Sequence, residues 1–322
     1  MLPVPQLSTA IDQADARIGE YIRRTPVEHS PWLSEATGGE VYLKLENHQL
    51  TGSFKLRGAL NRVLSSDEAT RGRGFVAAST GNHGLAMTHA AGLIGAELTV
   101  FVPTTAEAAK VELLRKAGVE VHAVGEDCTE AEAAARAFSD EQERTYVSPY
   151  NDPVVIAGQG TLGAELARQL PDLDAVFIAL GGGGLMAGAA AYLKTAQPLI
   201  EIVGCSPVNS AVMARSLEAG QLLDLPSQPT LSDGTAGGVE AGSITFELCQ
   251  ELVDRCVLVQ ESAIADALKA FTGRHHSLIE GAAAMVVAGL WTEGSRYADK
   301  RVALVLCGAN ISPSTLSGIL AA

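Results

Sequence analysis

Along most of the chain, short runs rich in β-branched and aromatic residues alternate with longer stretches rich in alanine and leucine. Four consecutive pairs of an expected strand and an expected helix cover residues 40–46 and 53–65, 74–79 and 82–95, 97–103 and 106–118, and 119–125 and 128–142. After a loop at 149–153, we expect a helix over 161–170 and strands at 174–180, 200–206 and 301–310. Strands and helices that alternate in this way form βαβ units, whose strands run parallel. The alternation predicts an α/β protein with open, mostly parallel, twisted sheets flanked by helices.

The size and charge of the chain narrow this class. With 322 residues, of which 47% are hydrophobic and 19% charged, the chain can bury a large core and is expected to divide into two domains. Its net charge of −14 offers no basic surface to a phosphate backbone, and lysine and arginine do not cluster anywhere along it. We therefore expect no nucleic-acid partner.

Three further patterns bear on the compartment. Residues 1–20 lack a positive region followed by an apolar core, which favours a cytoplasmic protein over a secreted one. Residues 176–193 are uncharged, but four consecutive glycines in their middle favour a buried strand, a loop and a buried helix over a membrane span. The five cysteines contain no CxxC pair, which favours reduced, mostly buried thiols. We expect no membrane partner, no disulfide and no zinc site.

Lys55 lies in the sequence TGSFKLRGAL, where small residues precede an expected helix and apolar residues follow. A lysine taken at random is a solvated surface group. The functional alternative is an amine in a tight, desolvated site, where a lowered pKa lets it form an imine with a carbonyl cofactor. The local pattern makes Lys55 a candidate for this second role.

Four glycines, Gly181 to Gly184, separate an apolar strand from an Ala-rich helix. Glycines let backbone N–H groups converge on an anion, and the helix adds its positive end, so the pattern predicts a phosphate site. A tight turn is the simpler alternative, but it needs fewer glycines. Gly182, Gly184 and Ala187 also fit a loose dinucleotide-binding pattern. The acidic residue expected about 20 positions later is missing, which makes a nicotinamide enzyme the second choice.

A third cluster joins the expected strand at 74–79 to the helix at 82–95. Hydroxyl, amide and imidazole groups at one helix N-terminus form a receptor for a carboxylate, whereas one serine or threonine would suffice as a helix cap. The cluster consists of Ser79, Thr80, Gly81, Asn82 and His83. It favours substrate binding.

His275 and His276 with Glu280 resemble a pair of metal ligands at helical spacing, but no further ligand lies near them in the sequence. A solvated helix face is the expected role of these three residues. The long irregular stretch at 226–242 is a further candidate part of a site, because long ordered loops are usually functional.

Taken together and in this order, SFKLRGA, STGNHG, GGGG and LCGAN resemble the motifs of fold type II enzymes dependent on pyridoxal 5′-phosphate (PLP). Among these enzymes, the chain is most similar to the serine/threonine dehydratases (threonine ammonia-lyases) and serine racemases. The resemblance implies two domains with the fold of the tryptophan synthase β subunit. Residues 1–74 with 148–322 would form the large PLP-binding domain, residues 75–147 a small mobile domain, and the active site the cleft between them.

The resemblance also assigns roles to individual residues. For the cofactor, it implies a Schiff base at Lys55, ring packing by Phe54, a contact of Asn82 with the 3′-oxygen, phosphate binding by Gly181, Gly182, Gly183, Gly184 and Leu185, and Cys307 beside the pyridine nitrogen. For the substrate carboxylate, it implies Ser79, Thr80, Gly81, Asn82 and His83. It places Glu280 near the ring and the loop SDGTAGG, residues 232–238, near the substrate side chain.

Several positions depart from patterns common in the family. Many members have serine at Cys307, and a thiol with a pKa near ~8.5 is at most a weak partner for the ring nitrogen, so this nitrogen should stay unprotonated and favour β-elimination. Thr80 keeps a hydroxyl where racemases carry serine, which leaves racemisation open. Ser206 and Val212 stand where metal-binding members have acidic residues, so we expect no activating cation there. Few residues follow Asn310, so we expect no isoleucine-binding regulatory domain.

The resemblance therefore predicts an ammonia-lyase that removes the β-hydroxyl of L-threonine, L-serine or a similar amino acid to give a 2-oxo acid and ammonia. In this mechanism, Lys55 takes the Cα proton. Amino-acid racemisation is the nearest alternative. Dehydration of 3-hydroxyaspartate, phenylserine or a hydroxyectoine-derived amino acid is another, and a non-enzymatic binding module is more remote. A homodimer is also implied.

Overall fold

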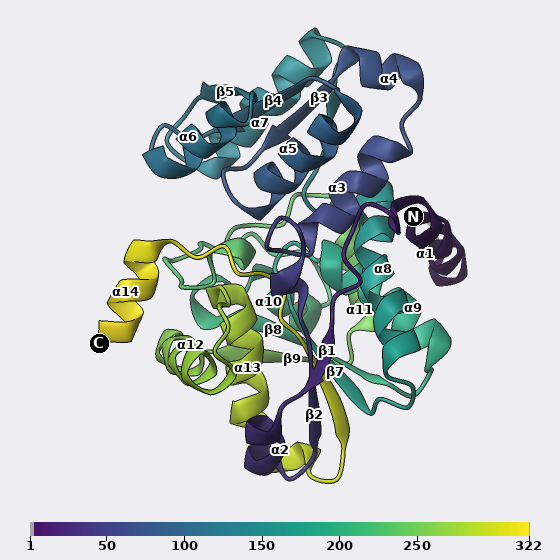
Figure 1. Ribbon diagram of the computed structural model, residues 1–322, viewed down its shortest axis with the longest axis vertical. Helices are drawn as coiled ribbons and strands as arrows, with labels where there is room; N and C mark the ends of the chain where they lie inside the picture. Colours follow the sequence, from purple (N-terminus) through teal and green to yellow (C-terminus); the bar gives the residue numbers. More distant parts are fainter. Residues whose placement is uncertain (1–2, 322) are drawn as a thin grey trace.

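The computed structural model describes residues 3–321 and contains two sheets, each covered by helices (Figure 1). The larger sheet has six strands in the order β1-β2-β10-β7-β8-β9. Its strands are β1 (Val27–His29), β2 (Glu40–Lys44), β7 (Ala175–Ala179), β8 (Glu201–Pro207), β9 (Arg255–Val259) and β10 (Arg301–Val305). Only β1 pairs antiparallel, with β2; the other pairs are parallel. The predicted fold class is confirmed.

The smaller sheet has four parallel strands in the order β5-β4-β3-β6, at the top of Figure 1. Its strands are β3 (Phe75–Ala78), β4 (Leu98–Val102), β5 (Glu120–Ala123) and β6 (Thr145–Tyr146), and its helices are α5 (Asn82–Ile94), α6 (Ala108–Lys116) and α7 (Cys128–Glu141). All seven elements fall within 75–147, the segment expected to form the small domain. The domain boundaries and the mobility of this part stay predictions.

Helices cover both faces of the larger sheet, whose central strand β7 is buried over its whole length. Continuous burial of this kind is typical of parallel strands between helical layers. The remaining helices are α1 (Val4–Ile18), α2 (Pro31–Thr37), α3 (Lys55–Leu64), α4 (Glu68–Arg73), α8 (Pro153–Gln169), α9 (Gly184–Ala196), α10 (Val212–Ala219), α11 (Ile244–Leu252), α12 (Glu261–His275), α13 (Gly281–Glu293) and α14 (Pro313–Ala321). Short 3₁₀ turns are η1 (Glu46–His48), η2 (Val208–Ser210), η3 (Asp233–Thr235) and η4 (Gly294–Tyr297).

Helix α8 packs against both α3 and α9 with unusually close backbones. A Cβ atom added at Gly158 in α8 would lie 2.6 Å from the Arg57 carbonyl oxygen in α3. One added at Gly188 in α9 would lie 2.3 Å from the Ile156 carbonyl oxygen in α8. Because α3 begins at Lys55 and α9 begins at the end of the glycine run, α8 fixes the distance between these two sequence motifs.

A buried charge network reinforces this arrangement. The Arg57 guanidinium group donates two hydrogen bonds of 2.8 Å to the Glu46 carboxylate and a third to Glu165. The Lys44 amine lies 3.4 Å from Glu165. All four side chains are almost completely buried. Two positive and two negative groups therefore balance inside the core and join β2, η1, α3 and α8.

The predictions about thiols and membrane spans can be compared with the structure. All five cysteines are unpaired, and Cys205, Cys249 and Cys307 are buried, whereas Cys128 is exposed. Residues 176–193 form strand β7, a loop and most of α9, as expected. Within residues 3–321, no helix combines the length and the apolar character needed to cross a membrane.

Candidate active site

Lys55 is the first residue of α3, directly after the buried ring of Phe54. Its Nζ atom donates a 2.8 Å hydrogen bond to the carbonyl oxygen of Pro149. Burial of the amine lowers the pKa of Lys55 to about 8, although the nearby Cys307 and Glu280 act in the opposite direction. An amine with this pKa is partly neutral near pH 7, as imine formation and proton transfer require.

The glycine run forms a loop between β7 and α9. The Gly182 carbonyl accepts a 2.6 Å hydrogen bond from Thr245 Oγ1, and the Gly183 carbonyl lies 3.8 Å from Cys249 Sγ, so both oxygens face α11. Among residues 3–321, the N–H groups of Gly181, Gly182 and Gly183 find no protein acceptor. No side chain caps the start of α9 either. Unpaired N–H groups at a helix N-terminus are suited to a phosphate group.

Steric contacts explain why glycine occupies this loop. Gly183 has a φ of 88°, in the left-handed region that favours glycine. A Cβ atom at Gly182 would lie 2.6 Å from the ring of Tyr150, and one at Gly181 would lie 2.8 Å from the Thr235 Cα atom. Leu185 follows in the first turn of α9 and is buried. The loop therefore needs small residues for packing as well as for its open N–H groups.

The cluster from Ser79 to His83 links β3 to α5, as expected. Gly81 is the N-cap residue of α5, and no side chain caps this helix, so the simpler role of the cluster as a helix cap is not supported. Ser79 Oγ accepts a 3.1 Å hydrogen bond from Gly81 N–H. The buried ring of His83 turns inward, with Nε2 2.9 Å from the Val147 carbonyl oxygen, and burial lowers its pKa to about 3. Thr80 lies beside Ser79 in the loop.

Asn82 meets residues that lie far away in the sequence. Its Nδ2 atom donates to both carboxylate oxygens of Glu280, at 2.9 and 3.0 Å, and its Oδ1 atom accepts from Asn310. Glu280 also accepts from the Asn310 backbone N–H at 3.1 Å and lies 3.8 Å from Cys307 Sγ. These contacts bring Asn82, Glu280 and Cys307 together on the side of the site where Lys55 begins α3.

The solvated helix face expected for His275, His276 and Glu280 is wrong. The two histidines end α12, whereas Glu280 is the N-cap residue of the next helix, α13, and is only 2% exposed. Residues 276–280 lie outside both helices and break the helical spacing on which that interpretation depended. Burial raises the pKa of Glu280 to about 7, against the lowering effect of the Asn82 hydrogen bond. Burial also raises the pKa of Cys307 well above its usual value, which keeps the thiol protonated.

Two contacts in the site could not be found from sequence motifs. Tyr150 packs its ring against the glycine loop, and Asn310 bonds to Asn82. The run PYND before α8 gave only the signal of a loop. At the family's metal position, Ser206 donates a 2.7 Å hydrogen bond to the Leu180 carbonyl, and Val212 is buried. That this position holds no cation stays a prediction.

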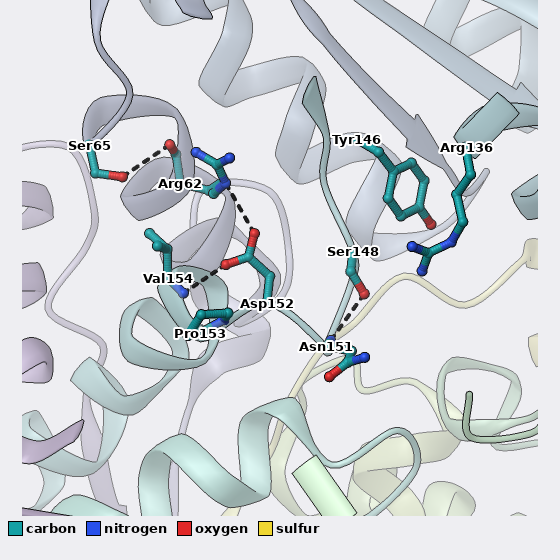
Figure 2. Close-up of a pocket in the computed structure, with 9 residues that line it drawn as sticks. All are labelled: Arg62, Ser65, Arg136, Tyr146, Ser148, Asn151, Asp152, Pro153 and Val154. Atoms are coloured by element: carbon teal, nitrogen blue, oxygen red, sulfur yellow. Dashed lines mark hydrogen bonds and ion pairs between the residues drawn. The ribbon is translucent and has the colours of Figure 1, made fainter. Parts of the chain in front are cut away.

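An open cleft with a volume of about 560 Å³ adjoins the site but does not include Lys55. Figure 2 shows its lining, which comes from α3, α7, β6 and the segment leading into α8. Its lining residues are Arg62, Ser65, Arg136, Tyr146, Ser148, Asn151, Asp152, Pro153 and Val154. The cleft lies between α3, α7 and the segment that leads from β6 into α8.

Comparisons with known proteins decide which cofactor this geometry serves. Residues 18–308 match the protein family described as "Pyridoxal-phosphate dependent enzyme". The chain belongs to this family. The match confirms the expected cofactor, pyridoxal phosphate, and gives no support to the nicotinamide alternative.

Relatives within the family include ammonia-lyases and racemases. The L-threonine ammonia-lyase of Thermotoga maritima is 38% identical over 96% of this chain and 77% of its own length. The threonine deaminase isoform 2 of Solanum lycopersicum superposes with a TM-score of 0.93 at 33% identity, covering 99% of this chain and 93% of its own. The serine racemase of Dictyostelium discoideum gives a TM-score of 0.88 at 32% identity, covering 95% and 98%. This chain is thus similar to both kinds of enzyme.

The described residues fit pyridoxal phosphate. The unpaired N–H groups of Gly181 to Gly183 suit its phosphate, and the Lys55 amine suits its aldehyde. Asn82 and the Cys307 thiol both contact the Glu280 carboxylate and would supply neutral polar groups to the ring. The assignment of each residue to its part of the cofactor stays a prediction.

Proposed function

We propose that this chain is a PLP-dependent ammonia-lyase that removes the β-hydroxyl group of L-threonine, L-serine or a similar amino acid, releasing a 2-oxo acid and ammonia. The observation that carries the proposal is that the Lys55 amine donates to the Pro149 carbonyl, while the next residue, Tyr150, packs against a glycine loop with unpaired N–H groups. Relatives named L-threonine ammonia-lyase support the reaction and the substrate class.

Lys55, Cys307 and the segment from Ser79 to Gly81 have distinct roles in this mechanism. When bound, pyridoxal phosphate supplies an electron-withdrawing ring that makes the Cα proton of an amino acid acidic. Lys55 holds that proton at Nζ, because burial keeps its amine partly neutral. Cys307 stays a neutral thiol and offers no negative charge to the ring nitrogen, which favours early loss of the β-substituent. The helix start at Ser79 to Gly81 orients the substrate carboxylate.

The first test replaces Lys55 by alanine. We expect Lys55→Ala to lose both ammonia release from L-threonine and the visible absorbance that a lysine-bound pyridoxal phosphate gives, because no other amine takes its place. Lys300→Ala is the matched control, since Lys300 forms only an exposed ion pair with Asp174. A Lys55→Ala protein with full turnover would overturn the assignment.

The substrate is tested by a panel of β-hydroxy amino acids assayed for ammonia and 2-oxo acid. L-Threonine and L-serine should give the highest kcat/KM. A clear preference for 3-hydroxyaspartate, phenylserine or a hydroxyectoine-derived amino acid would keep the chemistry and change the substrate. Turnover of none of them would contradict the proposed reaction.

Racemisation is the second candidate function. Thr80 supports it, because its hydroxyl lies at the uncapped start of α5 and is not used as a helix cap. Similarity to serine racemases of known structure adds to this support. Chiral analysis after incubation with L-serine separates the two functions. D-Serine without 2-oxo acid would reverse their order, and Thr80→Ala should remove any D-serine formed.

Two broader expectations complete the proposal. We propose a homodimer, on the family resemblance, and light scattering should then give twice the chain mass of 33.4 kDa. We also propose a cytoplasmic location, which five unpaired cysteines support because reduced thiols persist there. The acidic charge of −14 argues against a nucleic-acid partner.

A further inference from the structure

Residues 148–152 run between Lys55 and the glycine loop and contact both of them. The Pro149 carbonyl accepts the hydrogen bond from Lys55, while the next residue, Tyr150, packs against the glycine loop. A Cβ atom at Gly182 would lie 2.6 Å from the Tyr150 ring, and one at Gly184 would lie 2.8 Å from the Tyr150 Cα atom. With so little space between them, a shift of the Tyr150 ring must move the loop as well.

Glu240 fixes the far end of this ring. Its backbone N–H donates a 3.0 Å hydrogen bond to the Tyr150 hydroxyl oxygen. Burial raises the pKa of Tyr150 to about 12, so the hydroxyl stays protonated at neutral pH. Glu240 belongs to the long irregular segment that the sequence marks as a candidate part of the site.

The Glu240 carboxylate is held from two other directions. One oxygen lies 2.7 Å from the Arg136 guanidinium group in α7, and the other accepts from the Asn151 side chain. Asn151 in turn accepts a 2.9 Å hydrogen bond from the Ile244 N–H at the start of α11. Figure 2 shows Arg136 and Asn151 among the residues that line the cleft. Glu240 thus connects α7 of the smaller sheet with the residue that supports the glycine loop.

We propose that Glu240 is a positioning residue for phosphate binding: through Tyr150, it holds the glycine loop in the shape that binds the cofactor phosphate, and Arg136 and Asn151 keep Glu240 in place. The proposal rests on the phosphate role assigned to the glycine loop. An exposed ion pair alone contributes little to stability. Replacing Glu240 should therefore change the affinity for phosphate more than the stability of the fold. The carboxylate holds the Glu240 backbone in place, and the backbone N–H holds the Tyr150 ring that supports the glycine loop.

The test compares two ligands that differ only in the phosphate. The full-length protein, freed of cofactor, is titrated with pyridoxal 5′-phosphate and with pyridoxal, which has the same aldehyde and no phosphate. Tyr150→Phe loses the hydrogen bond from the Glu240 N–H, and Glu240→Gln loses the charge pairing with Arg136 that holds this N–H in place. We expect both variants to weaken binding of pyridoxal 5′-phosphate by about 5- to 30-fold, the usual effect of losing one or two hydrogen bonds. Binding of pyridoxal should change by less than about twofold, since hydrogen bonds to the phosphate are absent there.

Glu132→Gln is the matched control. Glu132 is the second acidic partner of Arg136, at 2.8 Å, but it lies on α7 itself and, within residues 3–321, makes no hydrogen bond to Tyr150. This variant should bind both ligands as the wild type does. Tyr150→Phe keeps the ring against the loop and removes only the hydroxyl, so it answers the question even if Glu240→Gln folds poorly.

Two results would overturn the proposal. One is wild-type affinity for pyridoxal 5′-phosphate in both Glu240→Gln and Tyr150→Phe. The other is an equal loss of affinity for both ligands, which would indicate a general structural role. If the wild type itself bound pyridoxal as tightly as pyridoxal 5′-phosphate, the glycine loop would not be a phosphate site. That result would contradict the premise of the proposal rather than the role of Glu240. None of these measurements involves an amino-acid substrate, so they are independent of the proposed ammonia-lyase activity.

Discussion

At the scale of single residues, the site depends on two ionisable groups whose pKa values burial shifts toward neutrality. Lys55 is shifted down to about 8 and Glu280 up to about 7. Desolvation is the largest cause in both cases, and it disfavours whichever form is charged. The site therefore holds an amine that can lose a proton and a carboxyl group that can keep one, both near physiological pH.

The Lys55 shift predicts how the apo protein should react with pyridoxal phosphate. At pH 7.5, about a quarter of an amine with a pKa of 8 is neutral, against about one in a thousand for an ordinary lysine. The rate of lysine-linked cofactor formation, followed by visible absorbance, should rise with pH and level off above about 8. A cofactor analogue without the aldehyde should show no such step. A midpoint near 10.5 would contradict the shift.

The Glu280 shift predicts a dependence of stability on pH. Because the folded protein holds this proton up to about pH 7 and the unfolded chain only to about 4.5, stability falls as pH rises between these values. Relative to Glu280→Gln, the apo wild type should lose on the order of 1–3 kcal/mol of unfolding free energy across this interval. Urea unfolding of both proteins at several pH values measures the difference. A constant difference would show that Glu280 does not titrate there.

At the scale of elements, the close packing of α3, α8 and α9 sets the distance between Lys55 and the glycine loop. Glycines at the crossing points let the backbones approach, as at Gly163, where a Cβ atom would lie 2.6 Å from the Ala189 carbonyl oxygen. Rigid backbone contacts of this kind give way much less easily than flexible side chains do. The site is thus built on helices that cannot move apart independently.

Alanine substitution tests this packing. Gly188→Ala should destabilise the protein by about 1–3 kcal/mol, because its Cβ atom would lie 2.3 Å from the Ile156 carbonyl oxygen. Gly273→Ala is the matched control in helix α12, where no atom lies within 4 Å of the added Cβ. The better helix propensity of alanine should stabilise that variant by up to about 1 kcal/mol. Thermal unfolding separates the two, and equal effects would contradict the packing argument.

Sequence patterns predicted the longer strands but missed three others. Strands β2, β3, β4, β5, β7, β8 and β10 form apolar runs bounded by breaks, so their positions follow from composition. The position of strand β9 does not follow from composition, because only two residues separate it from α11 and no break in the apolar pattern marks where the strand begins. Strands β1 and β6 have three and two residues, too short for any period to show.

In the candidate site, too, sequence motifs identified some residues and missed others. Lys55 and the glycine run stand out because their local sequence is unusual. The contacts of Asn82 with Glu280 and Asn310 join residues 198 and 228 positions apart, and only the fold brings them together. Only the fold also brings Tyr150 against the glycine loop, to which its role is tied. Local sequence therefore predicts the groups that do chemistry better than the groups that hold them.

At the scale of the whole molecule, the buried network of Lys44, Glu46, Arg57 and Glu165 joins the larger sheet to the helices of the site. An isolated buried charge is costly in free energy, so each of these four side chains can stay charged in the core only beside its partners. Arg57 holds the pKa of Glu46 below its usual value despite the burial that raises it. Loss of one member would leave an unbalanced charge in the core.

Arg57→Met should therefore destabilise the protein by about 3–5 kcal/mol, because it leaves two buried carboxylates with one lysine. Lys300→Met removes an exposed ion pair and should cost less than about 1 kcal/mol. Denaturant unfolding of the apo proteins measures both changes. A similar small effect for the two variants would mean that the network is dispensable for stability.

The distribution of tryptophan and exposed cysteine has a practical consequence. Both tryptophans of the chain lie beside the larger sheet, Trp32 in α2 and Trp291 in α13, with ring centroids 5.3 Å apart. The exposed thiol of Cys128 begins α7, beside the smaller sheet at the other end of the molecule (Figure 1). With tryptophan excitation, a fluorescent acceptor attached to Cys128 would thus receive energy from donors that both lie beside the larger sheet. The efficiency of this energy transfer would report the distance between the smaller and the larger sheet in solution, without any added tryptophan or cysteine.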